Sequence, residues 1–173
     1  PAEGGGEYGG YTRLATLLEE QRKRPAVLSD GSAVQGPTVT LDAGDFSMGS
    51  LFQTIYATDA PELRALGAMG YDATTLGNHE FDYRAAGLAD MLRAAVASGE
   101  ALPALVQANY KPPESDADSW DAWNAYGVTD YVVIEKERES REGPAEPVRV
   151  AVFGVLGVDA DECAPMSGME FEP

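Results

Sequence analysis

Two short polar segments hold residue types that could do chemistry. The first is DAGD at 42–45, which carries two carboxylates, and the second is GNHEFD at 77–82, which carries an amide, an imidazole and two carboxylates. Carboxylate and amide oxygens are hard ligands for divalent cations, and imidazole suits ions such as Zn, Mn or Fe. Gly44 and Gly77 allow the backbone to turn sharply just before the polar groups. The residue types and their spacing therefore indicate a divalent-metal site.

His79 is the single histidine of the 173 residues, although metal and acid–base sites often use several. Taken one at a time, an acidic turn and a lone histidine after a strand are ordinary structural features. Their occurrence at the ends of two consecutive strands favours a functional site over two unrelated turns.

The elements expected around these segments would bring them together. TVTL at 38–41 is predicted to be a short buried strand that ends at DAGD, and 72–76 a second strand that ends at GNHEFD. Helical sequence between residues 51 and 69 is long enough for a right-handed crossover, which places the carboxyl ends of both strands at one edge of a sheet. We therefore expect one cluster, made of Asp42, Asp45, Asn78, His79, Glu80 and Asp82.

The remaining chain completes an α/β pattern. Helices are predicted over 11–24 and 84–98, and further strands over 104–109, 128–137 and 147–157. Polar sequence at 29–37 and at 111–127 is predicted to form loops. Strands that alternate with helices indicate a parallel sheet, with antiparallel pairing of the last two strands left open. We find no internal repeat and no linker that would divide the chain.

Composition excludes several classes of partner. The chain has 12 basic and 29 acidic residues and a net charge of −17, which argues against a nucleic acid polymer or an anionic membrane surface as partner. No apolar run is long enough for a transmembrane segment. Cys163 is the single cysteine, so no intrachain disulfide is expected.

The two polar segments also carry a family resemblance. LDAGD followed by LGNHEFDY resembles the calcineurin-like metallophosphoesterases, and more narrowly their 5′-nucleotidase and 2′,3′-cyclic nucleotide phosphodiesterase branch. YGGYTRLATLL and VFGVLGVDADECAPMSG resemble further segments of that branch. The resemblance implies an α/β/β/α sandwich with a mixed sheet, two divalent metal ions (Mn, Zn or Fe), and hydrolysis of a nucleotide or another phosphomonoester.

Residue roles follow from the resemblance, position by position. It makes Asp45 the carboxylate that bridges two metals and Asn78 a ligand to one of them. It places His79 beside the scissile phosphoester, where the imidazole would stabilise charge or protonate the leaving oxygen. Asp82 would orient His79.

Two acidic residues of the cluster have no ligand role in the family pattern. Asp42 is expected to shape the turn at the end of its strand, and Glu80 to orient its loop.

Several parts of the family pattern do not occur in these residues. The family has Asp-x-His upstream and, downstream, a histidine and then Gly-His-x-His. We therefore expect residues 1–173 to be a single incomplete metallophosphoesterase domain, truncated at both ends and inactive by itself, with weak metal binding. The parent protein is expected to have a C-terminal substrate-binding domain and an extracellular, cell-wall or periplasmic location.

Three readings of the function stay open. The leading one is a 5′-nucleotidase or a 2′,3′-cyclic nucleotide phosphodiesterase/3′-nucleotidase. The second is an enzyme that uses the same metal site on another ester or on a sulfur-containing substrate. The third is a non-catalytic binding or cell-surface module that retains the fold, against which the retained pair of His79 and Asp82 argues.

Overall fold

The computed structural model describes residues 9–137, 147–157 and 159–164. The chain divides into two compact units, residues 1–38 with 135–149 and residues 39–134 with 150–173. Both polar segments lie in the second unit, so the candidate site is built within one unit. Residues 138–146, which fall within the charged segment ERESREGPAEP (137–147), lie outside the described residues, as do Tyr8, Val158 and 165–168 of the two flanking segments that resemble the family.

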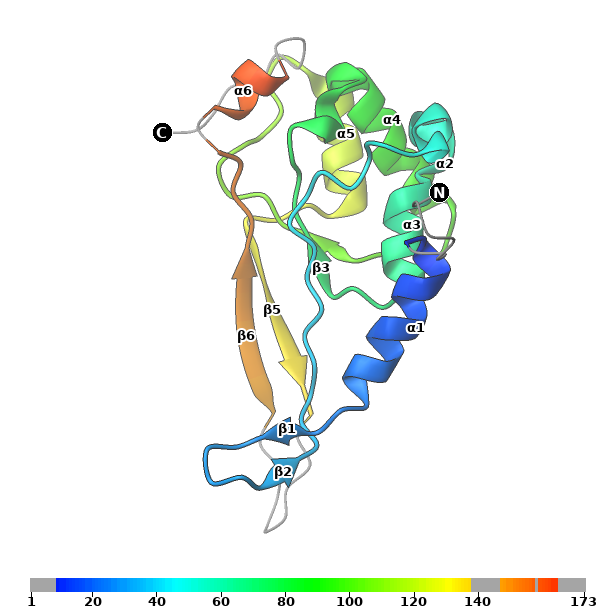
Figure 1. Cartoon of the computed structure of the whole chain (residues 1–173). Helices are drawn as coiled ribbons and strands as arrows, with labels where there is room; N and C mark the ends of the chain where they lie inside the picture. Colours follow the sequence, from blue (N-terminus) through cyan, green and yellow to red (C-terminus); the bar gives the residue numbers. More distant parts are fainter. Residues whose placement is uncertain (1–8, 138–146, 158, 165–173) are drawn as a thin grey trace. The chain divides into compact units, whose positions relative to one another are not determined.

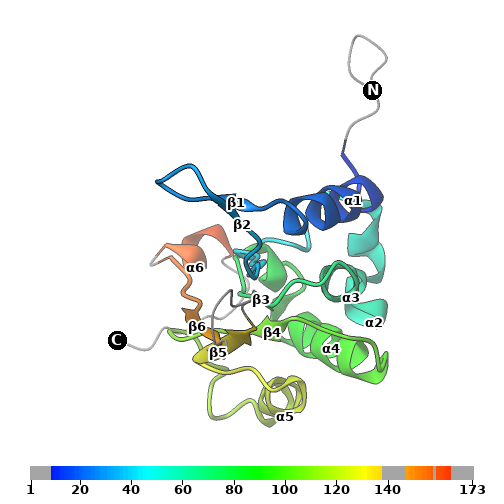
Figure 2. The same ribbon diagram turned by 90° about the horizontal axis from the view of Figure 1, so that it is seen from below.

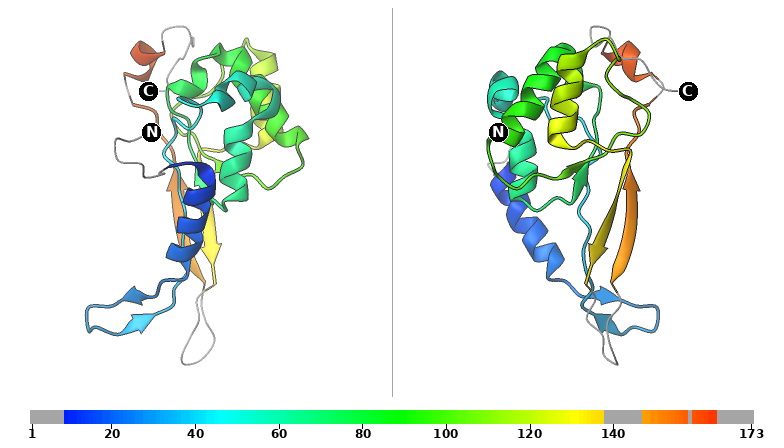
Figure 3. Two further views of the ribbon diagram at one scale, coloured as in Figure 1. Left: turned by 45° about the vertical axis from the view of Figure 1, so that its right-hand side comes forward. Right: turned by 180° about the vertical axis from the view of Figure 1, so that it is seen from behind.

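The first unit contains one helix and a small hairpin. Helix α1 spans Tyr11–Arg22, and strands β1 (Ala26–Val27) and β2 (Ala33–Val34) pair antiparallel, as Figure 3 shows. The prediction of a loop over 29–37 was wrong for β2. The hairpin forms because Asp30 Oδ1 accepts hydrogen bonds from the backbone and the hydroxyl of Ser32, which closes the turn.

A narrow strip of parallel backbone pairing lies at the centre of the second unit. Strand β3 (Ala73–Thr74) pairs parallel with β4 (Ala104–Leu105), and Leu41 bridges Ala73 on the other side (Figure 2). This confirms the predicted parallel arrangement, although β3 and β4 are shorter than expected. The prediction of a buried strand over 38–41 was wrong, since only Leu41 makes a bridge there and Leu41 is 48% exposed. One reason is that the Asp72 carboxylate accepts the N–H of Thr40 at 2.9 Å, so a side chain replaces a ladder hydrogen bond.

Helical segments form the crossover between the two polar loops. They are the 3₁₀ turn η1 (Leu51–Ile55), α2 (Tyr56–Asp59) and α3 (Pro61–Ala68). Ala60 separates α2 from α3 because its left-handed φ of 44° interrupts the helix.

Helix α4 (Arg84–Ala97) follows the second polar loop and contacts both α2 and α5 (Figures 1 and 3). Its alanine- and leucine-rich sequence favours a helix, and its buried face forms part of the core. The largest fully buried apolar side chains of the core are Tyr56, Tyr110, Phe81, Leu63, Leu76, Met91, Leu92, Leu105 and Val106.

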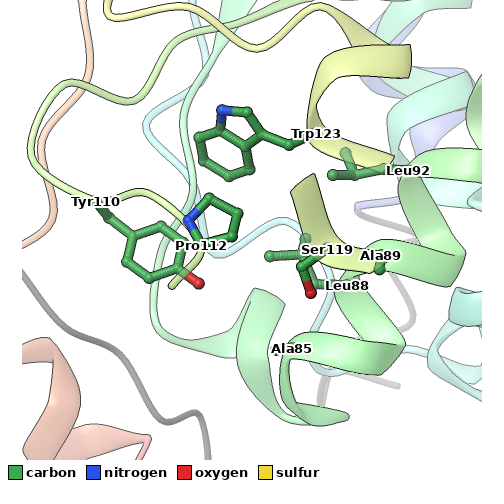
Figure 4. Close-up of a pocket in the computed structure, with 8 residues that line it drawn as sticks. All are labelled: Ala85, Leu88, Ala89, Leu92, Tyr110, Pro112, Ser119 and Trp123. Atoms are coloured by element: carbon green, nitrogen blue, oxygen red, sulfur yellow. The ribbon is translucent and has the colours of Figure 1, made fainter. Parts of the chain in front are cut away.

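The prediction of a loop throughout 111–127 was wrong, because helix α5 spans Ala117–Tyr126. Asp116 caps its first turn by accepting the N–H of Ser119, and Gly127 ends it in the left-handed conformation at φ 83°. Trp123 is buried edge-on against Tyr110 at a centroid distance of 5.8 Å. Figure 4 shows these rings beside a cavity of about 10 Å³, which is roughly the size of one water molecule.

Strands β5 (Tyr131–Lys136) and β6 (Val148–Phe153) pair in a two-stranded sheet and run in opposite directions (Figure 1). The short helix α6 spans Ala160–Cys163. Parallel and antiparallel pairs therefore both occur in this α/β chain. None of the helices formed by the described residues is long and apolar enough to cross a membrane.

Candidate functional site

The two polar loops touch through their backbones. A Cβ added to Gly44 would lie 2.6 Å from the backbone nitrogen of Gly77 and 2.7 Å from the carbonyl carbon of Leu76. Gly44 also has a φ of 87°, a conformation that side chains disfavour. Glycine at position 44 therefore allows the loop after Leu41 to pack directly on the loop after β3.

Asp45 is held against the second loop. Its Oδ1 accepts the backbone N–H of His79 at 3.0 Å, and its carboxylate packs on the backbone of Gly77. Its own backbone has a φ of 56°, which is rare for a residue with a side chain. Since Gly77 and His79 flank Asn78, the Asp45 carboxylate lies next to the backbone on both sides of Asn78.

Asn78 begins the 3₁₀ turn η2 (His79–Phe81), and its carbonyl accepts the N–H of Phe81 at 3.1 Å. Its amide side chain is half-buried and makes no hydrogen bond within the described residues. The amide oxygen of Asn78 is therefore available to a ligand.

His79 and Asp82 form a side-chain pair across the same turn. His79 Nδ1 lies 3.1 Å from Asp82 Oδ2 and 3.3 Å from Oδ1. A carboxylate oxygen only accepts hydrogen bonds, so Nδ1 carries the proton in this contact. The two side chains are 29% and 32% exposed, and the opposite ring nitrogen, Nε2, makes no hydrogen bond within the part of the chain that the structure describes.

Glu80 is fully buried, and its carboxylate joins the two loops. Its Oε2 accepts the backbone N–H groups of Asp45 at 2.9 Å and Gly77 at 2.6 Å, and its Oε1 accepts that of Ser47 at 3.0 Å. Burial raises the pKa of Glu80, and these N–H donors oppose that rise because they favour the charged form. The hydroxyl of Tyr56 also donates to the Glu80 carbonyl, at 2.8 Å.

Asp42 closes its own turn. Its Oδ2 accepts the N–H of Gly44 at 3.0 Å and the hydroxyl of Thr74 at 2.7 Å. This carboxylate oxygen is thus used in shaping the end of the strand, within the same loop that positions Asp45.

Comparisons of sequence identify nucleotidases as relatives, although no family model matches the chain. The chain is 41% identical over 86 residues to 5′-nucleotidase of Bos taurus, which is 49% of this chain and 13% of that protein. It is 26% identical over 150 residues to the 2′,3′-cyclic-nucleotide 2′-phosphodiesterase/3′-nucleotidase of Haemophilus influenzae, which is 85% of this chain and 20% of that protein.

Comparisons of structure show a shared fold. Calcineurin-like phosphoesterase YfkN from Bacillus subtilis matches with a TM-score of 0.65 and 22% identity, over 94% of this chain and 46% of that one. NAD nucleotidase NadN of Haemophilus influenzae matches with a TM-score of 0.63 and 21% identity, over 95% of this chain and 27% of that one. The chain is therefore similar in sequence to nucleotidases over part of their length, and it shares the fold of a calcineurin-like phosphoesterase. It spans 13% and 20% of the two curated relatives named above.

The donor set of the two polar loops fits part of a divalent-metal centre. Asp45 and Asn78 would hold the metal through side-chain oxygens, which is suitable chemistry for a hard or borderline cation. The described residues contain no group of three or more His, Cys, Asp or Glu side chains that could hold a metal ion. The residues present therefore fit as two ligands of a larger shell, since metal centres normally take three or four protein ligands per ion.

Sequence reasoning about the phosphoesterase site missed two residues of the crossover. Gln53 of η1 donates its side-chain N–H to Asp82 Oδ2 at 3.1 Å, and Tyr56 holds the backbone of Glu80. Neither residue belongs to a polar segment at a strand end. For Tyr56, its aromatic type in a helical pattern indicates burial, whereas no pattern indicates the contact of Gln53.

Proposed function

We propose that this chain supplies part of the catalytic centre of a binuclear-metal phosphoester hydrolase that acts on nucleotides. One observation carries the proposal: Asp45 lies against the backbone that flanks Asn78, within the turn that pairs His79 with Asp82. This arrangement supports a site in which two oxygen ligands and an oriented imidazole lie at one edge of the parallel strip. The names of the relatives support a nucleotide substrate.

The site residues would have separate roles in metal binding and in proton transfer. Asp45 would bridge the two metals and Asn78 would bind one of them. Divalent ions bound there would neutralise phosphate charge and lower the pKa of an attacking water. Asp82 keeps the proton of His79 on Nδ1, so Nε2 of a protonated ring could donate to the leaving oxygen.

The charge of the chain adds a constraint on how a nucleotide would be held. A net charge of −17 repels an anionic substrate at long range. Attraction therefore has to come from the bound ions themselves, which would be the largest local charges at the site. We infer that nucleotide binding depends strictly on metal.

The longer relatives support the proposal of further ligands and a substrate-binding domain elsewhere in the parent protein. The 173 residues by themselves should therefore be inactive and bind metal weakly. A further relative, a snake venom 5′-nucleotidase of Gloydius brevicauda at 36% identity over 85 residues, supports an extracellular location of the parent protein.

The test is hydrolysis by the protein that carries this chain, followed as phosphate release from AMP and as ring opening of 2′,3′-cyclic AMP to 3′-AMP. AMP and 2′,3′-cyclic AMP are each assayed with Mn²⁺ and with EDTA, which also separates the two substrate classes. Asp45→Asn should abolish the metal-dependent rate, while Asp90→Asn, on the exposed surface of α4, should leave it unchanged. A non-catalytic module would hydrolyse neither compound with any divalent ion. For the 173 residues alone, calorimetry that shows tight binding of two Mn²⁺ per chain would contradict the proposed inactivity.

A further inference from the structure

Gln53 contacts the acidic member of the histidine pair. Its Nε2 donates to Asp82 Oδ2 at 3.1 Å, and the same oxygen lies 3.1 Å from His79 Nδ1. The three side chains therefore form a chain of hydrogen bonds that runs from the crossover to the imidazole. Gln53 lies in η1, 29 residues before Asp82 in the sequence.

The backbone of Gln53 is itself anchored to the second loop. Its carbonyl accepts the hydroxyl of Tyr83 at 3.1 Å. The ring of Tyr83 stacks on Tyr56, with centroids 5.7 Å apart and planes 19° apart, and Tyr56 is buried. Ser50 caps the start of η1 by accepting the N–H of Phe52. Gln53 is thus presented to Asp82 from a fixed turn.

The Asp82 carboxylate needs a second donor to keep its orientation. Its side chain is 32% exposed, so water competes for its oxygens and the group can rotate. The amide of Gln53 holds Oδ2 and leaves both oxygens facing Nδ1 of His79. An imidazole held at Nδ1 presents Nε2 in one fixed direction, as proton transfer to a reacting oxygen requires.

We propose that Gln53 is a positioning residue, which orients Asp82 and through it the imidazole of His79. The effect of Gln53 on catalysis rests on the proposed function. Its effect on the tautomer and orientation of the His79 ring does not depend on that function. Gln53 does not touch the substrate in this account. Its effect falls on proton donation to the leaving oxygen and leaves the metal ligands unchanged.

The structural part is tested with the histidine itself. Because His79 is the single histidine of the chain, its ring nitrogens give one unambiguous set of ¹⁵N signals. In the unaltered chain the neutral ring should carry its proton on Nδ1. Gln53→Met, which keeps the length but removes the donor, should shift the population toward the Nε2–H form. Gln35→Met is the matched control, since Gln35 donates its amide to the Arg22 carbonyl in the first unit.

The catalytic part is tested with two leaving groups in the protein that carries the chain. Gln53→Met should lower kcat for AMP by about tenfold, a fraction of the ~10²–10⁴-fold that a positioned acid supplies. The loss should be much smaller for p-nitrophenyl phosphate, whose leaving oxygen needs little protonation. KM, Mn²⁺ affinity and the thermal midpoint should stay close to those of the unaltered protein.

Each outcome decides between the proposals. Unchanged ¹⁵N signals in Gln53→Met would overturn the positioning role. An equal loss on both substrates, or a large fall in thermal midpoint, would assign Gln53 a purely structural role and overturn it as well. If the unaltered protein hydrolyses neither substrate while the ¹⁵N shift occurs as expected, the proposed function fails and the positioning of His79 stands.

Discussion

Gly77→Ala is the substitution whose effect on the site can be worked most directly from the structure. A Cβ at this position would lie 2.6 Å from both Cγ and N of Asp45 and still closer to Oδ1. Carbon atoms in contact lie about 3.5–4.0 Å apart, so the Asp45 carboxylate must move by roughly 1 Å. A displacement of about 1 Å in a catalytic group can cost on the order of 10²-fold in rate.

The assay compares metal-dependent hydrolysis of AMP with stability. Gly77→Ala should lower kcat/KM by about 10²-fold and weaken Mn²⁺ binding, with a stability loss of about 1–3 kcal/mol from overpacking. Gly77 does not have a positive φ, so alanine brings no backbone strain there. Gly36→Ala is the matched control, because a Cβ at Gly36 meets no atom within 4 Å. Unaltered kcat/KM and Mn²⁺ affinity in folded Gly77→Ala would refute the placement of Asp45 as a ligand.

Three further predictions concern stability, each measured by urea unfolding. Glu80→Gln should destabilise the chain by about 1–3 kcal/mol, because an amide cannot accept all three N–H groups. An unchanged midpoint of urea unfolding would contradict the role of the Glu80 carboxylate in joining the two loops. Glu62 is buried with no hydrogen-bond partner for its carboxylate in the described residues, and burial raises its pKa. A carboxyl group whose pKa is higher in the folded state stabilises the fold at pH values below its unfolded-state pKa. This contribution is lost as the pH rises through the folded-state pKa. Glu62→Gln should therefore become more favourable relative to the unaltered chain from pH 5 to pH 8, and equal differences at both pH values would contradict this. Trp123→Ala should cost about 3–5 kcal/mol, whereas Trp120→Ala should cost less, since Trp120 is only partly buried.

The approach of the two polar loops could be predicted because it depends on local rules. Apolar runs that end in Gly and polar residues indicate strand ends, and the handedness of a crossover fixes which ends meet. The Leu41–Ala73 bridge bears this out. The catalytic and metal-binding roles of Asp45, Asn78, His79 and Asp82 stay predictions.

Two local features were missed for different reasons. Helix α5 had readable signals, an Asp at its N-cap and a Gly at its C-cap, but acidic and proline-rich flanks outweighed them. The hairpin of β1 and β2 has only two residues in each strand, so its pairing is hardly visible as an alternating pattern. The contact of Gln53 with Asp82 has no signal in the local sequence at all, because it depends on tertiary packing between residues that are 29 positions apart.

The crossover and the first polar loop act on different parts of the second loop. The first loop reaches Gly77, His79 and Glu80 through backbone and carboxylate contacts, which fix Asp45 against the turn. The crossover reaches Asp82 through Gln53. Substitutions at Gln53 should therefore disturb the imidazole pair while Asp45 and Asn78 keep their places. Changes at Gly44 or Gly77 should disturb the ligands first. Measuring metal affinity and leaving-group dependence together separates these two effects.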